Sequence, residues 1–300
     1  MKLAAGADPS QHPAAITVGV FDGVHRGHVA LISELVEKAR ADGLSVGVLS
    51  FDPHPVEVLA PTKAPPLLTS PERRVELLRG LGVDWVGMLD LRQIRTMSAE
   101  EFVTGVLVDK VACRMILVGE DFRFGRDRGG DVALLGELGE RLGFETVALG
   151  LVSDDGEAIS STRIRQLVTE GEVRAAADLL GRPHRITGPV IHGEARGRTL
   201  DYPTANLECP PGMAMPADGI YAVRANRRPG VASLGVRPTF GIGGTRLLEV
   251  HLFEFEGDLY GSSLDVDFVE RLRGEERFDS VDDLVAQMER DSAAARRILS

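Results

Sequence analysis

The sequence predicts an α/β fold with a parallel sheet, followed by a smaller antiparallel β domain that ends in a helix. Over residues 1–183, short apolar runs alternate with segments whose apolar residues repeat at helical spacing. That alternation is typical of a parallel sheet covered by helices. From residue 184 onward, short alternating segments are separated by turn-rich stretches, which favours a small barrel or sandwich. We therefore expect two domains, 1–183 and 184–300.

Composition is that of a soluble globular protein. The 300 residues suffice for two ordinary domains, with 43% hydrophobic and 26% charged residues. The net charge of −11 argues against a nucleic-acid binder, because no broad basic face is available for counterion release. Anionic ligands must then be held by helix N-termini, a few arginines or a metal ion.

Signals of export or membrane insertion are not found in the sequence. The N-terminus reaches Asp8-Pro9 before an apolar core of secretory length can form, and no apolar run approaches membrane-spanning length. Cys113 and Cys209 lie far apart without metal spacing, which is typical of reduced packing residues. We expect a cytoplasmic protein with no membrane partner, and an oligomer is possible although the sequence does not determine one.

The elements of the first domain follow from its apolar runs and its helix caps. The predicted strands are 15–20, 45–51, 85–89, 115–118 and 145–149. The predicted helices are 29–41, one capped by Ser70 with Pro71 behind it, one opened by a capping box at Ser98, 132–142, and one that begins near Ser160. In the second domain the predicted strands are 186–192, 219–224, 231–236, 247–253 and 264–268, before a helix from Ser280 towards Leu299.

The stretch 19–28, Gly-Val-Phe-Asp-Gly-Val-His-Arg-Gly-His, joins the first predicted strand to the first helix. In that geometry, backbone N–H groups and the helix dipole converge on a phosphate. His25 and His28 can donate to phosphate oxygens and, when protonated, stabilise a phosphoryl transition state. Gly27 keeps side-chain bulk away from an approaching polyphosphate. Histidines that only cap the helix or face solvent are the alternative. The other candidate binding residues of this stretch are Gly19, Phe21 and Asp22.

Three further loops lie at the ends of predicted strands or at a helix start. His54 follows the strand 45–51 within Asp-Pro-His-Pro, although a plain surface histidine is an equal alternative. Asp121 lies in the mixed acidic, aromatic and basic loop 119–125. Hydroxyls and a guanidinium at a helix start can form a second phosphate clamp. The alternative is that Ser160 or Ser161 is only the N-cap of this helix. That predicted clamp consists of Ser161, Thr162 and Arg163.

The second domain contains two candidate groups. A glycine-spaced segment precedes Pro-Thr-Ala-Asn, and a hydroxyl and an amide there suit a nucleotide and Mg²⁺, which prefers oxygen ligands. These candidates are Gly193, Gly197, Arg198, Thr204 and Asn206. Glu249 alternates with apolar neighbours along one strand, so the opposite face offers its carboxylate to a cavity. Such a carboxylate can accept the proton of an attacking hydroxyl. An ordinary solvated strand face is the alternative.

The motifs together resemble those of the bacterial bifunctional riboflavin kinase/FAD synthetase family over nearly the full chain. The stretch 19–28 alone is similar to many nucleotidyltransferases that move an adenylyl or cytidylyl group, whereas its combination with 203–206 and Glu249 is specific. The matching segments are 19–28, 51–55, 119–125, 159–165, 197–200, 203–206, 238–240, 249–252, 258–261 and the ending around Arg273, Glu275, Phe278, Ser280, Gln287 and Asp291.

The resemblance implies a Rossmann-like nucleotidyltransferase domain and an antiparallel β-barrel riboflavin kinase domain. The barrel would phosphorylate riboflavin to FMN with Glu249 as base, and Thr204 and Asn206 would serve the Mg²⁺–ATP site. The first domain would then transfer AMP from ATP to FMN, giving FAD and pyrophosphate. In that domain His25 and His28 would steady the phosphates. The other implied contacts are Arg163, Ser161 and Thr162 at the phosphates, Asp121 and His54 on the flavin or metal side, and Arg273 among the ligand-binding residues of the barrel.

A departure from the family pattern at Asp201 and three alternative functions accompany the resemblance. The family usually has glycine where this chain has Asp201, which adds a negative charge beside the implied ATP site. That charge motivates an adenylyltransferase whose barrel only binds flavin. A non-enzymatic flavin-binding protein is a second alternative, although it has little use for both histidines and a base. A nucleotidyl acceptor other than FMN, such as phosphopantetheine, would suit the first domain but would leave the barrel unexplained.

Overall fold

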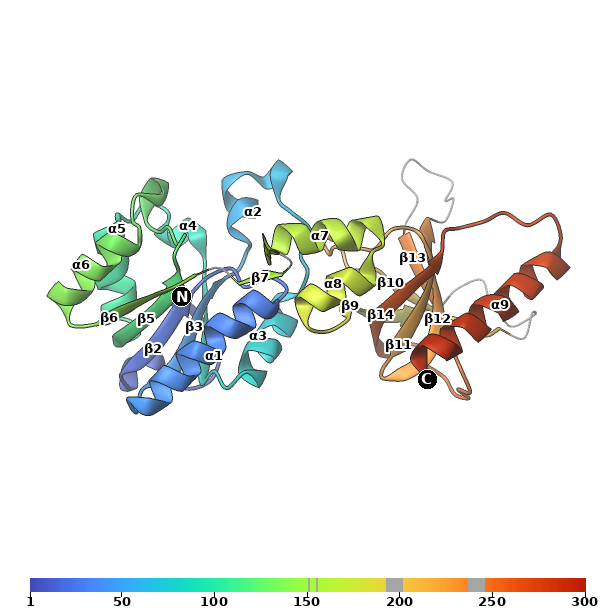
Figure 1. Ribbon diagram of the computed structural model, residues 1–300, viewed down its shortest axis with the longest axis horizontal. Helices are drawn as coiled ribbons and strands as arrows, with labels where there is room; N and C mark the ends of the chain where they lie inside the picture. Colours follow the sequence, from blue (N-terminus) through green and yellow to red (C-terminus); the bar gives the residue numbers. More distant parts are fainter. Residues whose placement is uncertain (151, 155, 193–201, 237–245) are drawn as a thin grey trace. The chain divides into compact units, whose positions relative to one another are not determined.

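Two sheets of different kinds organise the chain: a six-stranded, mostly parallel sheet and a closed barrel. The computed structural model describes residues 1–150, 152–154, 156–192, 202–236 and 246–300 (Figure 1). The chain divides into one unit of residues 1–65 and 69–160 and a second unit of residues 66–68 and 161–300. The α/β fold with a parallel sheet, the antiparallel barrel and the terminal helix are all confirmed.

The sheet of the first unit has the order β1-β4-β3-β2-β5-β6. Strands β2 to β6 are parallel to one another, and β1 pairs antiparallel with β4 at the edge. The strands are β1 (Lys2–Ala5), β2 (Ala14–Val18), β3 (Ser45–Phe51), β4 (Trp85–Leu89), β5 (Cys113–Gly119) and β6 (Glu145–Leu149), and a separate hairpin is formed by β7 (Ser153–Asp154) and β8 (Glu157–Ala158). The central β2 is therefore flanked by β3 and β5.

Short side-chain caps start several helices of this unit. The Ser70 hydroxyl accepts from the Arg73 N–H at 3.1 Å, and Ser98 and Glu101 form the predicted capping box. The helices are η1 (Pro9–Gln11), α1 (Arg26–Ala41), α2 (Pro55–Leu59), η2 (Pro61–Lys63), α3 (Pro71–Gly80), α4 (Leu91–Ile94), α5 (Ala99–Phe102), the π-helix η3 (Val103–Val108), η4 (Arg126–Arg128) and α6 (Val132–Leu142).

Helices cover both faces of the sheet because its strands are apolar on both faces. Along β2, Ala14 and Ile16 join one core cluster with residues of α5, η3 and α6. Ala15 points to the other face and joins a second cluster with residues of α1 and α3, including Ile32 and Leu78. Side chains alternate between the faces of a strand, so each residue of β2 is buried. The unit is a three-layer α/β sandwich (Figure 1).

The second unit closes six antiparallel strands in the order β10-β13-β12-β11-β14-β9, with β9 also paired to β10. The strands are β9 (His184–Ile191), β10 (Ala205–Glu208), β11 (Gly219–Ala225), β12 (Arg228–Val236), β13 (Arg246–Leu252) and β14 (Ser263–Arg273). Helix α9 (Val281–Leu299) is capped by Ser280, and its Ala295 and Leu299 pack against Ala222 and Phe253 on the outside of the barrel.

Helices α7 (Ser161–Glu170) and α8 (Val173–Leu180) connect the sheet to the barrel along the chain. Both belong to the second unit, because Val173 packs into the barrel core with Ile186 and Phe268. A functional boundary near Pro183 therefore stays a prediction, since this packing places the two preceding helices with the barrel. Among the described residues, no helix combines the length and the apolar character needed to cross a membrane.

Candidate functional sites

The first candidate site lies where β2 ends and α1 begins. His25 is buried and is the N-cap of α1, and its Nδ1 accepts from the His28 N–H at 3.4 Å. A ring nitrogen that accepts a hydrogen bond carries no proton, so a neutral His25 keeps its proton on Nε2. Capping therefore uses only the Nδ1 acceptor of His25, and a phosphate contact by His25 stays a prediction. Capping and a phosphate-binding role are compatible here.

The aromatic rings of this loop pack tightly against one another. The His25 and His28 rings stack with centroids 3.6 Å apart, and the Phe21 ring meets His28 edge-on at 5.0 Å. A Cβ atom at Gly27 would lie 3.2 Å from the His25 ring, and one at Gly19 would lie 2.9 Å from the Phe21 ring. Both glycines therefore make room for aromatic rings. The structure adds this role to the predicted one, in which Gly27 leaves space for a polyphosphate.

Asp22 occupies a different position from the histidines of the same loop. Its carboxylate is fully buried, and Oδ1 accepts from the backbone N–H and the hydroxyl of Thr69 at 3.0 and 3.2 Å. The Thr69 hydroxyl in turn accepts from the Gly23 N–H at 3.1 Å. These contacts give Asp22 a part in shaping the loop, and ligand contact by Asp22 stays a prediction.

The neighbouring strands bring two more candidates to the same edge of the sheet. His54 follows β3 and caps α2, with its Nδ1 accepting from the Val56 N–H at 3.2 Å. Asp121 follows β5 and is exposed. Because β3 and β5 flank β2, the three loops lie at the carboxyl ends of adjacent parallel strands, where ligands bind in open α/β sheets. The structure therefore places His25, His54 and Asp121 in neighbouring loops, and a single site shared by them and His28 stays a prediction.

The predicted clamp at residues 161–163 starts the second unit. Ser161, Thr162 and Arg163 form the first turn of α7, whereas Ile159 belongs to the first unit. The Ile159 carbonyl lies 3.8 Å from the position of a Cβ on Gly27, so the chain passes the start of α1 just before α7 begins. A phosphate contact by the clamp stays a prediction.

The second candidate site is a row of side chains that crosses five strands of the barrel. Strand register aligns Asn206 of β10 with Glu249 of β13, Glu249 with Ser233 of β12, Ser233 with Ile220 of β11, and Ile220 with Arg273 of β14. Directly opposed residues on antiparallel strands share one face of a sheet. A predicted metal ligand, a predicted base and a predicted binding arginine therefore stand on one face.

This row points away from the barrel interior. Leu248 and Val250, which flank Glu249 along β13, are buried in the barrel core together with Leu207 and Leu234 of the paired strands. Successive side chains of a strand point to opposite faces, so Glu249 stands on the outer face. The sequence prediction that Glu249 lies on the face opposite to the packed one is confirmed. Glu249 lines neither of the two cavities described below, so the prediction that its carboxylate faces a cavity stays a prediction.

Arg273, at the end of the row, is held by a carboxylate of the C-terminal helix α9. Its Nε and Nη2 donate to the carboxylate of Asp291 at 2.9–3.2 Å, and its Nη1 donates to the Gly274 carbonyl at 2.9 Å. Gln287 donates to the same carboxylate at 2.8 Å, and the Phe278 ring lies 5.7 Å from the guanidinium. Asp291 and Gln287 appear in the motif at the end of the sequence, but sequence reasoning assigned them no role.

A cavity of about 810 Å³ opens beside this row. Ser233, Ile220 and Arg273 line it together with the segment 275–281 and Leu284. It therefore borders the row to which Glu249 belongs and the loop that leads into α9. A cavity of this size lies in the range of small-molecule binding sites.

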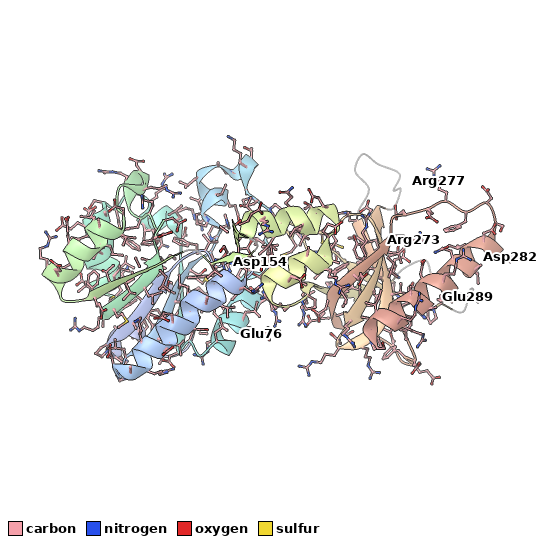
Figure 2. All side chains as sticks on the ribbon, in the orientation of Figure 1. Glu76, Asp154, Arg273, Arg277, Asp282 and Glu289 are labelled. Carbon is pink, nitrogen blue, oxygen red and sulfur yellow. The ribbon has the colours of Figure 1, made fainter. Side chains whose placement is uncertain are left out.

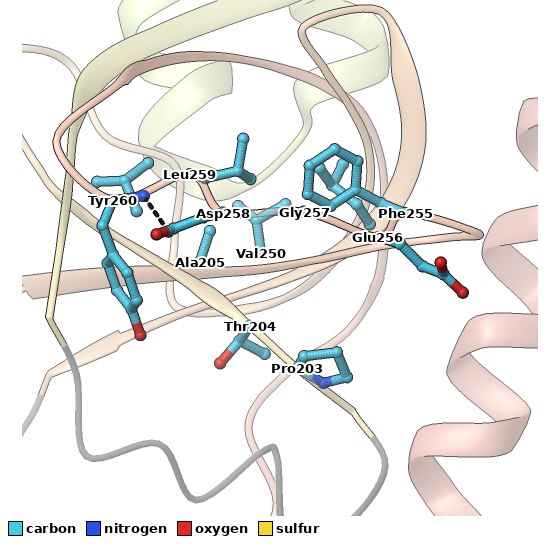
Figure 3. Close-up of a pocket in the computed structure, with 12 residues that line it drawn as sticks. Pro203, Thr204, Ala205, Val250, Phe255, Glu256, Gly257, Asp258, Leu259 and Tyr260 are labelled. Carbon is cyan, nitrogen blue, oxygen red and sulfur yellow. Dashed lines mark hydrogen bonds between the residues drawn. The ribbon is translucent and has the colours of Figure 1, made fainter.

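A second cavity, of about 280 Å³, lies next to Thr204 (Figure 3). Pro203, Thr204 and Ala205 line one part of it, and the segment 255–260 lines another, with the Tyr260 N–H donating to Asp258 Oδ1 at 2.9 Å. Apolar barrel residues complete the lining, which suits a purine ring with polar groups at its edge. The acidic and aromatic segment 255–260 was not predicted as part of a site beyond its motif at 258–261.

Oxygen ligands for a metal ion are present, although no cluster of three or more His, Cys, Asp or Glu that fits a metal occurs among the described residues. Thr204 and Asn206 contribute a hydroxyl and an amide, a donor set that suits Mg²⁺ when phosphates and water complete the shell. Asn206 is buried and is paired in register with Glu249. Gly193, Gly197, Arg198 and Asp201 lie outside the described residues.

The cysteines take no part in either site. Burial raises the pKa of the Cys113 thiol to about 12, and burial also raises the pKa of Cys209. A thiol with a raised pKa is a poor nucleophile and a poor metal ligand near neutral pH. Both residues are free thiols, in keeping with packing roles.

Similarity to known proteins extends over both units. Residues 7–163 match the FAD synthetase family, and residues 180–299 match the riboflavin kinase family. The chain is 39% identical to the bifunctional riboflavin kinase/FMN adenylyltransferase of Escherichia coli K12, covering 99% of this chain and 97% of that protein. It is 41% identical to the protein of that name from Pseudomonas fluorescens, covering 97% and 94%.

A solved structure shares the whole architecture. It is a crystal structure from Streptococcus pneumoniae described as a macrolide-efflux protein, with a TM-score of 0.88 and 34% identity. The match covers 96% of this chain and 97% of that chain. Both units, in the same order along the chain, are therefore found together in another protein.

Proposed function

Because this chain belongs to the family of bifunctional riboflavin kinases/FMN adenylyltransferases, we propose that it makes FAD from riboflavin in two ATP-dependent steps. The barrel phosphorylates riboflavin to FMN, and the α/β domain transfers AMP from ATP to FMN. One observation carries the proposal: the chain combines a stacked histidine pair at a helix N-terminus with an outward row that contains Asn206, Glu249 and Arg273.

In the barrel, Glu249 accepts the proton of the terminal ribityl hydroxyl of riboflavin. The hydroxyl oxygen then forms a bond to the γ-phosphorus of ATP, and the bond from that phosphorus to the bridging oxygen breaks to release ADP. The flavin occupies the 810 Å³ cavity, where Arg273 is oriented by Asp291. The adenine occupies the smaller cavity beside Thr204 and Tyr260.

Mg²⁺ is the metal that the oxygen donors Thr204 and Asn206 suit, and Gly193, Gly197 and Arg198 complete the proposed nucleotide contacts. When bound, the ion neutralises negative charge on the transferred phosphates. Thr204 and Asn206 also orient the nucleotide towards Glu249, since Asn206 and Glu249 are opposed across β10 and β13.

In the α/β domain, an oxygen of the FMN phosphate attacks the α-phosphorus of ATP, and pyrophosphate leaves. No covalent enzyme intermediate is required, so positioning and charge stabilisation carry the catalysis. His25 and His28 stabilise the phosphates at the N-terminus of α1. The further proposed contacts are Gly19, Phe21, Asp22, His54, Asp121, Ser161, Thr162 and Arg163.

The remaining ligands and the location follow from this chemistry. Riboflavin, FMN, FAD and ATP are the small-molecule ligands, and neither nucleic acid nor a membrane is a proposed partner. We place the boundary between the two activities near Pro183, and we place the enzyme in the cytoplasm, where ATP is available.

Chromatography of riboflavin incubated with the protein, ATP and Mg²⁺ tests the proposal. FMN should appear first and then give way to FAD. If riboflavin is unchanged while added FMN becomes FAD, the barrel only binds flavin, and Asp201 is the first residue to revert to glycine. If neither flavin changes, the proposed function is wrong.

A further inference from the structure

The loop between β2 and α1 contains two non-glycine residues with left-handed backbone. Phe21 has φ of 53° and Val24 has φ of 39°. Left-handed φ is unfavourable for residues with a side chain, and most of all for a β-branched valine. Such conformations persist where the surrounding structure holds them, and they gather at functional sites. Contacts that hold this loop therefore matter to the site that it forms.

One set of contacts comes from Thr69, directly before α3. Its N–H and hydroxyl both donate to the buried carboxylate of Asp22, and its hydroxyl oxygen accepts from the Gly23 N–H. Asp22 and Gly23 lie between the two strained residues, Phe21 and Val24. Thr69, through its backbone N–H and its hydroxyl, thus contacts both residues that the strained residues enclose.

A second set comes from Arg74 on α3, whose side chain is 1% exposed. Its Nη1 donates to the Val20 carbonyl at 2.8 Å, to the Ser50 hydroxyl at 3.0 Å and to the Phe51 carbonyl at 3.1 Å. The Ser50 hydroxyl also donates to the Val20 carbonyl at 2.9 Å. Arg74 therefore ties the residue before Phe21 to the end of β3.

Arg74 occupies an electrostatically unfavourable place. Burial lowers the pKa of its guanidinium, and the charges of Asp22, Asp52 and Glu72 oppose that change. Its buried Nε has no hydrogen-bond partner among the described residues. A buried arginine with an unsatisfied donor contributes little to folding stability. A role in holding the loop therefore explains the buried position of Arg74 better.

The held loop connects directly to a predicted catalytic side chain. Phe21, between Val20 and Asp22, places its ring edge against the His28 ring at 5.0 Å, and His28 stacks on His25. A shift of the backbone at Val20 or Asp22 therefore moves the ring that supports the histidine pair. Neither Thr69 nor Arg74 needs to touch the substrate for this to affect the reaction.

We propose that Thr69 and Arg74 are positioning residues for adenylyl transfer, holding the strained loop so that Phe21 orients His28 and His25. The inference rests on the proposed function of the α/β domain and adds residues to which sequence analysis gave no role. Misplacement of reacting groups by about 1 Å can reduce a rate by about 100-fold. Thr69 and Arg74 therefore affect the rate of adenylyl transfer rather than the presence of the site.

The test compares Thr69→Val with Thr69→Ser, and Arg74→Met with Arg74→Lys. The matched control is Arg73→Met, because Arg73 is the preceding residue of α3 and its side chain pairs only with Glu76 on the helix surface among the described contacts. FMN adenylylation is measured as kcat and KM for ATP. Riboflavin phosphorylation by the same molecules reports whether the chain is folded.

We expect Thr69→Val to lower kcat for adenylylation at least tenfold while riboflavin phosphorylation stays within twofold of wild type. Thr69→Ser restores kcat because it keeps the hydroxyl, Arg74→Lys restores it in part, and Arg73→Met changes nothing. Arg74→Met should lower the same kcat, and the proposal is overturned if Thr69→Val and Arg74→Met both keep wild-type kcat. It is also overturned if adenylylation falls only in step with phosphorylation and thermal stability. Wild-type protein that forms no FAD from FMN contradicts the proposed function instead.

Discussion

The two sites of this protein position their functional groups in different ways. In the α/β unit, His25, His54 and Asp121 lie in loops that follow three adjacent parallel strands. In the barrel, Asn206 and Glu249 lie within strands, and the hydrogen-bonded ladder sets their relative position. A loop has no such ladder, so other side chains must hold it. The difference predicts that the geometry of the first site depends on side chains that support its loops without belonging to the site. The geometry of the second site depends mainly on the strand register of its own residues.

The largest effect that separates the two regions is expected from Glu249→Gln. Loss of the general base should lower riboflavin phosphorylation by about 100- to 10,000-fold, and FMN adenylylation should stay at the wild-type rate. Rates with riboflavin and with FMN as separate substrates give the measurement. Glu254→Gln, on the exposed carboxylate that pairs with Arg296, is the matched control and should leave both rates unchanged. Equal loss of both activities would contradict a base confined to the barrel reaction.

The converse effect is expected from His28→Ala. Removing a group that stabilises developing charge should lower FMN adenylylation by about 100- to 1,000-fold, with riboflavin phosphorylation intact. His12→Ala changes an exposed histidine before β2, at the opposite edge of the sheet, and should change neither rate. A variant that adenylylates FMN normally would remove the histidine pair from the mechanism.

A smaller effect tests whether the barrel row also needs support at its end. Asp291→Asn weakens the charge-assisted hydrogen bonds that hold Arg273. Such bonds contribute roughly 1.5–3 kcal/mol, so KM for riboflavin should rise about tenfold, with little change in KM for ATP. Glu289→Gln, on an exposed position of α9 (Figure 2), is the control. An unchanged KM for riboflavin would show that the row needs no support from α9.

The smallest effect is expected at the amino ends of the parallel strands, opposite to the first candidate site. Asp84 accepts hydrogen bonds from Arg40 and from the Val46 N–H, and these bonds lower the pKa of its carboxyl. A lowered pKa gives stability that is present above the unfolded value near 3.8 and is lost as the pH falls below it. Both side chains are more than a third exposed, so Asp84→Asn should destabilise the protein by at most about 1 kcal/mol.

Urea unfolding at pH 7 and at pH 3 measures this contribution. The difference between Asp84→Asn and wild type should be full at pH 7 and smaller at pH 3. Both enzymatic rates should be unchanged, because the residue lies at the amino end of β4. A larger difference at pH 3 than at pH 7 would contradict the assigned direction of the pKa change.

Most strands could be predicted because their sequences carry a local signal. The runs 45–51, 85–89 and 145–149 match β3, β4 and β6 to the residue. Strands β3 and β4 are apolar and buried on both faces, which sets them apart from their flanks, whereas β6 is partly exposed. Strand β1 was missed because its residues are mostly exposed and its pairing with β4 is tertiary. Strand β10 was missed because it is only four residues long, so its alternation of apolar and polar residues is too short to stand out from the flanking loops.

The residues of the candidate sites also differ in whether the local sequence indicates them. The histidines after β2 were predictable because glycines and a helix start accompany them in sequence. The row from Asn206 to Arg273 was not predictable, because the register of five strands depends on barrel closure. Arg74 was missed because an arginine on a helix is ordinarily exposed, and only packing against the loop buries this one. Thr69 was missed because its contacts with Asp22 and Gly23 join residues that are far apart in the sequence.

Complementation between two inactive variants tests the division of labour most directly. Glu249→Gln and His28→Ala are incubated with riboflavin, ATP and Mg²⁺, first separately and then together. Glu249→Gln alone should leave riboflavin unchanged, His28→Ala alone should accumulate FMN, and the mixture should produce FAD. A mixture that produces no FAD although His28→Ala accumulates FMN, or a single variant that loses both activities while folded, would contradict two separate sites in one chain.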